Sequence, residues 1–277
     1  MSTNTVMSEP KKNLRRKIVS QDEWLVARKR LLAKEKESTR LHDQLARERR
    51  DLPWVKVKKD YVFEGPKGKV TLADLFDGRS QLVIYHFMFG PDWKEGCPSC
   101  SFLMDHANGA VPHLKARDVT FTAVSRAPLA KIETFKKRMG WQFPWVSSFE
   151  NDFNTDFHVS FTKEEMAQGK VNYNYTLQEF PSQEAPGLSV FYKDGNGDIF
   201  HTYSAYARGA EPIVGAYMLL DMVPKGRDED ELDFSMAWVR HHDRYGTDEF
   251  ADPDKPYWPA TATPSSTGCG CGSEAHS

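Results

Sequence analysis

Residues 82–100 contain the stretch that decides the fold: Leu82-Val83-Ile84-Tyr85-His86-Phe87-Met88-Phe89, a short polar loop, and then Gly96-Cys97-Pro98-Ser99-Cys100. The apolar octet predicts a buried strand. Apolar residues after the second cysteine recur at helical spacing, at Leu103, Ala107, Ala110, Val111 and Leu114. The first turn of a helix offers unpaired N–H groups and the positive end of the dipole, which favour a thiolate. We therefore predict Cys97 as a nucleophile.

The two cysteines of this motif have the spacing of a redox-active pair. Positions i and i+3 lie on one face of a helix, so Cys97 and Cys100 can close a small disulfide. We expect Cys97 to attack a substrate disulfide and the more buried Cys100 to resolve the mixed disulfide. Lys94 would lower the pKa of the Cys97 thiol further, and Glu95 would oppose this effect. The alternatives are half of a tetrahedral zinc site and two cysteines that only pack.

Composition narrows the class of protein. The chain has 277 residues, 39% apolar and 12% aromatic, which is typical of a globular protein with one main domain and extensions. Its net charge of −2 arises from mixed signs, so we expect no nucleic-acid partner. No run approaches the roughly 20 apolar residues of a membrane span, and Met1–Arg16 lacks the apolar stretch of a secretory signal. We expect no membrane partner and a cytoplasmic location.

The amino-terminal part predicts a long helix. Ser20–Glu23 matches a capping box, which marks a helix start. Sparse apolar residues among many charges continue the helical pattern to about Arg50, and Pro53 should end it. We expect residues 1–18 to be disordered and residues 19–53 to form a helical arm. This arm either packs across its own domain or forms a homodimer.

Residues 54–245 alternate between strand and helix patterns. A second strand, Val119–Val124, and a helix at about Leu129–Met139 continue the pattern after the dithiol, which predicts parallel β-α-β units. Leu188–Tyr192 and Ile199–Tyr203 flank an Asp-Gly-Asn-Gly turn and predict an antiparallel hairpin. The expected fold class is α/β, with a central mixed sheet flanked by helices.

Two segments stand apart from this domain. Residues 161–185 are polar with interspersed Tyr173, Tyr175 and Phe180, and we interpret them as an insertion that either covers the site or packs into the core. Residues 246–277 are rich in Asp, Pro, Thr, Ser and Gly, which predicts a flexible, disordered tail.

Several strings carry a family resemblance. They are Gly68-Lys69-Val70-Thr71-Leu72-Ala73-Asp74-Leu75-Phe76, Val124-Ser125-Arg126, Phe143-Pro144-Trp145-Val146-Ser147 and Asp194-Gly195. Together they resemble the thioredoxin-like superfamily, especially its peroxiredoxin and thiol-disulfide-reductase branch. Asp92–Cys100 and Trp238–Tyr245 are more closely similar to a bacterial family of unknown function that is described as thioredoxin-like. The resemblance runs from about Val19 to Tyr245 and implies a thioredoxin-like fold.

The chain departs from two relatives within this superfamily. Peroxiredoxins place a hydroxyl residue three positions before the reactive cysteine and a proline seven before it, where this chain has Lys94 and Gly90. This difference argues against peroxidase activity. Thioredoxin has a tryptophan directly before its first cysteine, whereas Trp93 lies four positions earlier here. We expect Trp93 to contact the substrate and the charged approach to alter the choice of partner.

Further residues are candidates for the site. The resemblance implies that Pro186 is a cis-proline opposite the dithiol that offers backbone groups to a substrate; the alternative is a trans proline that leads a strand. Arg126 follows a strand that should end near the dithiol, where it would orient an anionic substrate or lower the Cys97 pKa, or else be an ordinary loop arginine. His241 and His242 are expected to be surface or hydrogen-bonding residues rather than proton-transfer groups or metal ligands, and His86 to be a core residue with its hydrogen bonds satisfied.

The tail adds a second pair of cysteines, Cys269-Gly270-Cys271. They would pass electrons to the dithiol, complete a zinc or copper site with Cys97 and Cys100, or make no contact with it. We expect a thiol-disulfide oxidoreductase without a cofactor that acts on a disulfide-containing protein or a small thiol. The alternatives are a zinc- or copper-binding protein and a redox-inert adaptor whose helix recruits a partner.

Overall fold

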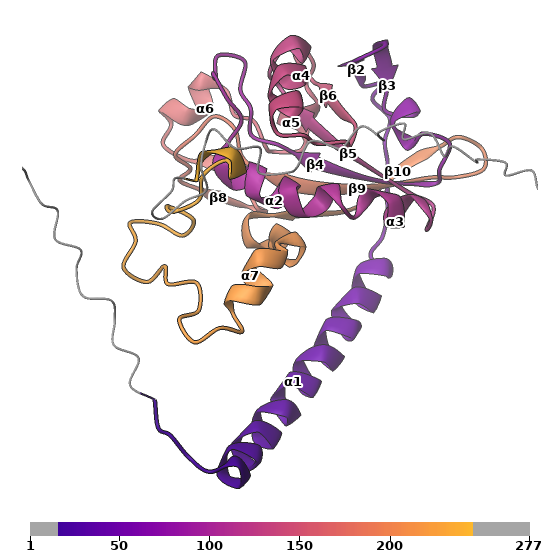
Figure 1. Cartoon of the computed structure of the whole chain (residues 1–277). Coiled ribbons are helices and arrows are strands. Elements are labelled where there is room, and N and C mark those ends of the chain that lie inside the picture. Colours follow the sequence, from indigo (N-terminus) through magenta and orange to yellow (C-terminus); the bar gives the residue numbers. More distant parts are fainter. Residues whose placement is uncertain (1–15, 246–277) are drawn as a thin grey trace, which may run out of the picture.

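The structure, a computed structural model, describes residues 16–245 of the chain (Figure 1). The predictions for the flexible tail, including those for Cys269 and Cys271, lie outside the described residues, as do those for most of residues 1–18.

The predicted amino-terminal helix is confirmed as α1, Gln21–Arg50. Its capping box is formed: the Glu23 N–H donates to the Ser20 hydroxyl at 3.3 Å, and the Ser20 N–H donates to the Glu23 carboxylate at 3.0 Å. The helix contains no buried residue and projects away from the sheet (Figure 1). The interpretation that it packs across its own domain is therefore wrong, because its apolar residues are too sparse to form a buried face. Self-association through this helix stays a prediction.

A single mixed sheet forms the centre of the domain, in the order β1-β10-β9-β4-β5-β6-β2-β3. The strands are β1 Val55–Lys56, β2 Val62–Gly65, β3 Gly68–Thr71, β4 Gln81–His86, β5 Val119–Ser125, β6 Trp145–Ser147, β9 Gly187–Lys193 and β10 Ile199–Tyr206. Strands β4, β5 and β6 are parallel, whereas β9 is antiparallel to both β4 and β10. The predicted mixed sheet and the predicted hairpin are thereby confirmed.

Short helices complete the domain. The α-helices are α2 Pro98–Asn108, α3 Val111–Lys115, α4 Leu129–Arg138, α5 Phe153–Asp156, α6 Lys163–Ala167 and α7 Gly215–Leu220, and the 3-10 helices are η1 Asp74–Phe76, η2 Ala207–Ile213 and η3 His242–Arg244. The residues from Leu103 to Leu114 that recur at helical spacing are divided between two helices, because the chain breaks between α2 and α3. Pro112 accounts for the break, since it has no N–H to donate and its ring would collide with the preceding turn.

The central strand β4 is buried on both faces, as expected for the middle of a sheet. Tyr85, together with Phe87 just beyond the strand, packs against α2 and α4. Leu82 and Ile84 face the other way, toward Phe153. Tyr85 is therefore on the face of the sheet that carries the dithiol helix.

The insertion has its own small structure. It contains α6 and a separate two-stranded sheet, β7 Val171–Tyr173 and β8 Thr176–Gln178. Tyr173 is buried in a cluster with Phe161, and Phe180 packs against that cluster, whereas Tyr175 is 74% exposed. Tyr173 and Phe180 are therefore explained by packing, whereas Tyr175 is not.

The connectivity of these elements is thioredoxin-like. The unit β4-α2-β5 is parallel, the hairpin β9-β10 is added beside β4, and the dithiol is at the start of the helix that follows β4. Within residues 16–245, no helix combines the length and the apolar character needed to cross a membrane.

Candidate active site

The loop between β4 and α2 places Cys97 at the start of a helix. Cys97 is the N-cap residue of α2, and its N–H donates to the Met88 carbonyl at 3.0 Å. Its own carbonyl accepts from both the N–H and the hydroxyl of Ser101, each at 2.9 Å. Pro98 fits the first helical position because the N–H that it lacks would have no partner there. The predicted arrangement of strand, loop and Cys-x-x-Cys helix is present.

The environments of the two sulfurs differ sharply. Cys97 is half-buried and Cys100 is 2% exposed, and both are free thiols. Hydrogen bonds from the Cys100 thiol and from the N–H groups of Cys100 and Ser99 outweigh burial and lower the Cys97 pKa to about 7. Burial, followed by the effect of the Cys97 sulfur, raises the Cys100 pKa well above its ordinary value. Cys97 is therefore the sulfur that ionises first.

Tyr85 was not among the predicted site residues, although a tyrosine within an apolar strand is a signal that the sequence carries. Its side chain is fully buried, next to Cys100. Burial, followed by the Cys100 sulfur, keeps the Tyr85 pKa well above its usual range. The hydroxyl therefore remains protonated and can act only as a neutral donor or acceptor.

The carboxyl-terminal motif contacts the loop that carries the dithiol. The Nε2 atom of His241 donates to the Gly96 carbonyl at 2.8 Å, and Arg138 of α4 donates to the His241 Nδ1 atom at 3.0 Å. Arg138 also forms a bidentate ion pair with Asp243, at 2.7 and 2.9 Å. Glu95 lies 3.4 Å from Arg138 and pairs with Arg244. No motif in the sequence indicated this contact with Gly96.

The histidines have the structural roles that were expected. His241 is 4% exposed, and burial lowers its pKa, so it is neutral. The Nδ1 atom of His242 lies 2.7 Å from Asp105. His86 is a core residue, as expected, and its Nε2 atom bonds to the Ser189 hydroxyl at 2.8 Å. Its Nδ1 atom has no hydrogen-bond partner within the described residues, so the expectation that both ring nitrogens are satisfied is wrong. In residues 16–245, no three or more His, Cys, Asp or Glu side chains are grouped so as to hold a metal ion, and the predicted four-sulfur site requires cysteines outside this range.

Trp93 lies in the loop that carries the dithiol, and Arg126 directly follows β5. Trp93 is partly buried against the cluster that contains Cys100, and its indole nitrogen would lie 2.9 Å from a Cβ atom at Gly90. Arg126 pairs with the buried carboxylate of Glu184 at 2.9 Å. Contact of Trp93 and Arg126 with a substrate stays a prediction.

The expectation of a cis-proline is wrong, because residues 16–245 contain no cis peptide bond. Pro186 follows Glu184, which forms an extended bridge with Ser160, and it leads directly into β9. This extended path is compatible with the trans form. The Pro186 carbonyl accepts a hydrogen bond from the Tyr173 hydroxyl at 2.8 Å. A backbone contact between Pro186 and a substrate stays a prediction.

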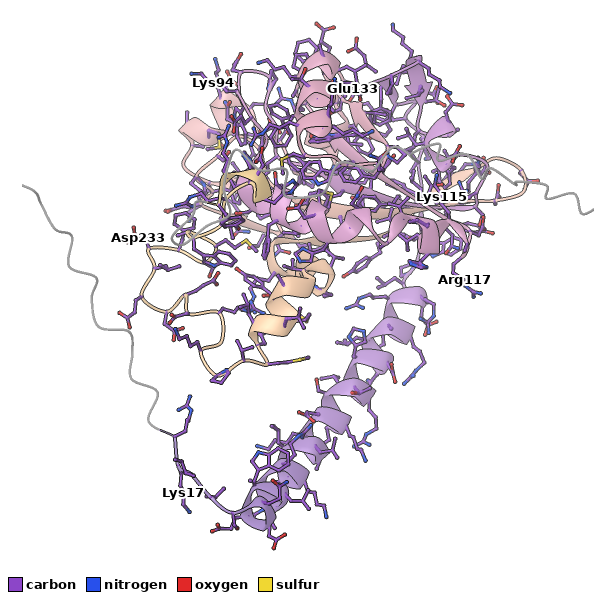
Figure 2. The ribbon with its side chains drawn as sticks, in the orientation of Figure 1. Lys17, Lys94, Lys115, Arg117, Glu133 and Asp233 are labelled. Carbon is purple, nitrogen blue, oxygen red and sulfur yellow. The ribbon has the colours of Figure 1, made fainter. Side chains whose placement is uncertain are left out.

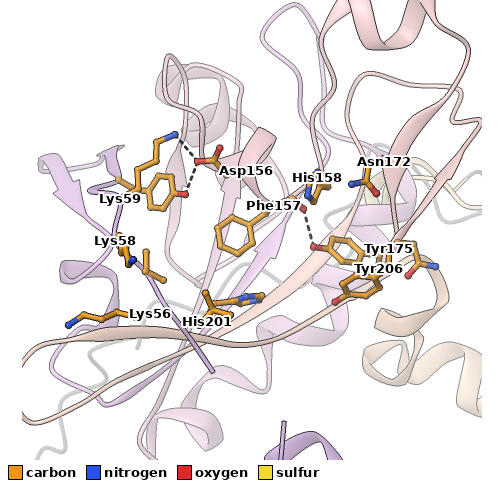
Figure 3. Close-up of a pocket in the computed structure, with 14 residues that line it drawn as sticks. Lys56, Lys58, Lys59, Asp156, Phe157, His158, Asn172, Tyr175, His201 and Tyr206 are labelled. Atoms are coloured by element: carbon orange, nitrogen blue, oxygen red, sulfur yellow. Dashed lines mark hydrogen bonds and ion pairs between the residues drawn. The ribbon is translucent and has the colours of Figure 1, made fainter. Parts of the chain in front are cut away.

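A separate groove of about 600 Å³ lies on the face of the sheet opposite the dithiol (Figure 3). Lys56, Lys58 and Lys59 line one side of it, and Tyr175 and Tyr206 line the other. Neither Cys97 nor Cys100 lines this groove. On the dithiol side, a cleft of about 410 Å³ lies between the loop and α4. Lys94, which lines that cleft, is at the surface and remote from α1 (Figure 2).

A dithiol at the start of the helix after the central strand of this mixed sheet defines a thioredoxin-like α/β protein. The chain belongs to the family described as "Bacterial protein of unknown function (DUF899)", which matches residues 13–245. The resemblance inferred from the sequence is thereby confirmed. No curated protein matches the sequence.

Solved structures that are similar to this chain include several peroxiredoxins. Peroxidoxin BcpB from Mycobacterium tuberculosis is 13% identical, with a TM-score of 0.39, and the match covers 59% of this chain and 94% of that one. A mutant of PrxQ from Xylella fastidiosa, in which a cysteine is replaced by serine, is 16% identical, with a TM-score of 0.37, covering 57% and 88%. The mitochondrial 2-cys peroxiredoxin from Plasmodium falciparum is 12% identical, with a TM-score of 0.36, covering 60% and 91%.

Proposed function

We propose that the protein is a thiol-disulfide oxidoreductase that uses Cys97 and Cys100. The observation that supports this proposal most directly is the asymmetry of the pair: Cys97 has a pKa of about 7 and is partly accessible, whereas Cys100 is buried and its pKa is raised. A thiolate near neutral pH is an effective attacking group, and a neighbouring protonated thiol is held in reserve for the second step.

The reaction would proceed in two exchanges. The Cys97 thiolate attacks one sulfur of the substrate disulfide, so that a mixed disulfide forms and the other substrate sulfur leaves as a thiolate. Cys100 then loses its proton to solvent and attacks the Cys97 sulfur. The Cys97–Cys100 bond forms, the second substrate thiolate leaves and takes a proton from water, and two electrons have passed from the protein to the substrate. An external dithiol must reduce the protein again.

The proposed substrate is a protein disulfide or a small-thiol disulfide, because the chemistry at Cys97 requires only an accessible sulfur–sulfur bond. We propose a reducing compartment such as the cytoplasm as the location, since regeneration needs a supply of reduced thiols.

Insulin reduction and glutathione-disulfide reduction, each with dithiothreitol as the electron donor, test this proposal. We expect Cys97→Ser to lose turnover and Cys100→Ser to accumulate a mixed disulfide without sustained turnover. Equal rates for the wild type and Cys97→Ser would refute the proposed oxidoreductase activity. Stoichiometric zinc or copper in freshly purified protein that is lost in Cys97→Ser would instead favour the metal-binding alternative.

A further inference from the structure

Tyr85 differs from the other buried tyrosines of residues 16–245 in what its hydroxyl contacts. The hydroxyls of the other four bond to a carboxylate or a carbonyl: Tyr61 to Asp156, Tyr173 to Pro186, Tyr206 to Phe157 and Tyr217 to Glu229. The Tyr85 hydroxyl is buried and makes no hydrogen bond of ordinary geometry within the described residues. A buried polar group without a partner is unfavourable for the folded state, and a phenylalanine would fill the same space without that cost.

The Cys100 thiol is a polar group close to this hydroxyl, since each of the two side chains affects the pKa of the other. Both side chains are buried in the cluster between β4 and α2, and Cys100 is 2% exposed. A neutral thiol is a weak acceptor, so it satisfies the hydroxyl poorly. A thiolate is a strong acceptor, because hydrogen bonds to charged groups are shorter and stronger than those between neutral groups. The hydroxyl therefore has a good partner only when Cys100 carries a charge.

We propose that Tyr85 is a catalytic residue for the resolving step, and that its hydroxyl donates a hydrogen bond to the Cys100 sulfur as this sulfur ionises. This inference rests on the proposed oxidoreductase function. In the step concerned, Cys100 gives its proton to solvent, its thiolate attacks the Cys97 sulfur of the mixed disulfide, the Cys97–Cys100 bond forms, and the substrate sulfur leaves as a thiolate. Tyr85 keeps its own proton throughout.

This arrangement separates the two halves of the reaction. The Cys97 thiolate is stabilised by hydrogen bonds from Cys100 and Ser99, and Tyr85 is not among the groups that lower its pKa. The nearby Tyr85 hydroxyl does lower the pKa of Cys100, against the larger effect of burial. Loss of the hydroxyl should therefore slow the second exchange and leave the first unchanged, because only interactions that strengthen toward the transition state accelerate a step.

The test uses the reduced full-length protein and a coloured aromatic disulfide, dithiobis-nitrobenzoate, in a stopped-flow instrument. Cys269→Ser and Cys271→Ser are introduced in every variant compared, because these two thiols would also react with the reagent. Attack by Cys97 then releases the first coloured thiol, and resolution by Cys100 releases the second. For Tyr85→Phe we expect an unchanged first phase and a second phase that is slower by about tenfold or more at neutral pH. Tyr61→Phe is the matched control, because its hydroxyl bonds to the Asp156 carboxylate at 2.7 Å and its ring packs in the cluster on the other face of the sheet. Both of its phases should match the wild type.

Two further measurements separate this effect from a loss of structure. Thermal unfolding of Tyr85→Phe should occur at the wild-type temperature or above it, because an unsatisfied hydroxyl is removed. In a Cys97→Ala background, Tyr85→Phe should raise the Cys100 pKa, measured by thiolate absorbance. A second phase and a Cys100 pKa that do not change would overturn the role of Tyr85 and leave the oxidoreductase intact. Absence of a second phase in the wild type would overturn the oxidoreductase itself.

Discussion

The His241 side chain donates from Nε2 to the Gly96 carbonyl at 2.8 Å, across 145 positions of the chain. A carbonyl can only accept, so the proton of the neutral ring must be on Nε2, which leaves Nδ1 free to accept from Arg138 at 3.0 Å. The carboxyl-terminal motif thus fixes the residue directly before the proposed nucleophile.

We expect His241→Ala to lower the free energy of unfolding by about 1–3 kcal/mol, because the buried Gly96 carbonyl and an Arg138 N–H lose a partner. Chemical denaturation measures this difference. His113→Ala, at an exposed position, is the control and should change stability by less than about 0.5 kcal/mol. A His241→Ala protein as stable as this control would show that the contact contributes nothing.

Gly96 itself should not tolerate a side chain. A Cβ atom there would lie 2.6 Å from the Phe87 ring and 2.8 Å from the Phe135 ring, both of which are buried. We expect Gly96→Ala to destabilise the protein by about 1–3 kcal/mol through overpacking. At Gly109 a Cβ atom would meet nothing within 4 Å, and its φ of −72° suits any residue, so Gly109→Ala should be neutral or stabilising. Equal melting temperatures for Gly96→Ala and Gly109→Ala would contradict the expected clash at Gly96.

The reactivity of Cys97 should titrate near neutral pH. We expect the rate of alkylation by iodoacetamide to be half-maximal at a pH of about 7, compared with about 8.5 for an ordinary thiol. Cys100→Ser should raise the pH of this midpoint, because the hydrogen bond from the Cys100 thiol is the largest cause of the lowered Cys97 pKa. An unchanged midpoint would mean that the serine hydroxyl forms the same hydrogen bond to Cys97 as the Cys100 thiol does.

The same titration links pH to stability. Folding lowers the Cys97 pKa, so the thiolate stabilises the folded protein fully above about pH 8.5, and this contribution is lost as the pH falls through about 7. The difference in unfolding free energy between the reduced wild type and Cys97→Ser should therefore move in favour of the wild type as the pH is raised through this window. The opposite trend would show that the thiolate is not stabilised.

The helix α1 should mediate self-association. Its exposed apolar residues include Leu31 and Leu45, which are available to a second copy of the chain. We expect the double variant Leu31→Glu, Leu45→Glu to convert a dimer into a monomer in analytical ultracentrifugation. Arg40→Glu lies on the side of the helix opposite Leu31 and Leu45 and should leave the dimer intact. A wild type that sediments as a monomer at all concentrations would contradict the prediction.

Local patterns were sufficient to predict most of the fold. The apolar run before Cys97, the capping box at Ser20 and the turn before Ile199 each act over a few residues, and each is found in the structure. The break after Asn108 was also encoded locally, in Pro112, but the apolar spacing continued across it and concealed it. The spacing of apolar residues does not show whether the N–H that Pro112 lacks will end a helix along which the apolar face continues.

The site was only half predictable for a different reason. The placement of Cys97 and Cys100 follows from the geometry of one helix end, which is local. The contact between His241 and Gly96, and the position of Tyr85 beside Cys100, depend on how separate elements pack. The bridge between Ser160 and Glu184, which precedes the trans Pro186, likewise joins two separate segments and is not indicated by any pattern near Pro186.

The burial of Cys100 beneath Cys97 also bears on survival under oxidative stress. A stray oxidant that converts Cys97 to a sulfenic acid leaves a thiol within reach, and condensation of the two yields a disulfide, which ordinary reductants can reverse. If the pair is redox-active as proposed, the buried Cys100 thiol would thus protect the more accessible Cys97 from irreversible oxidation.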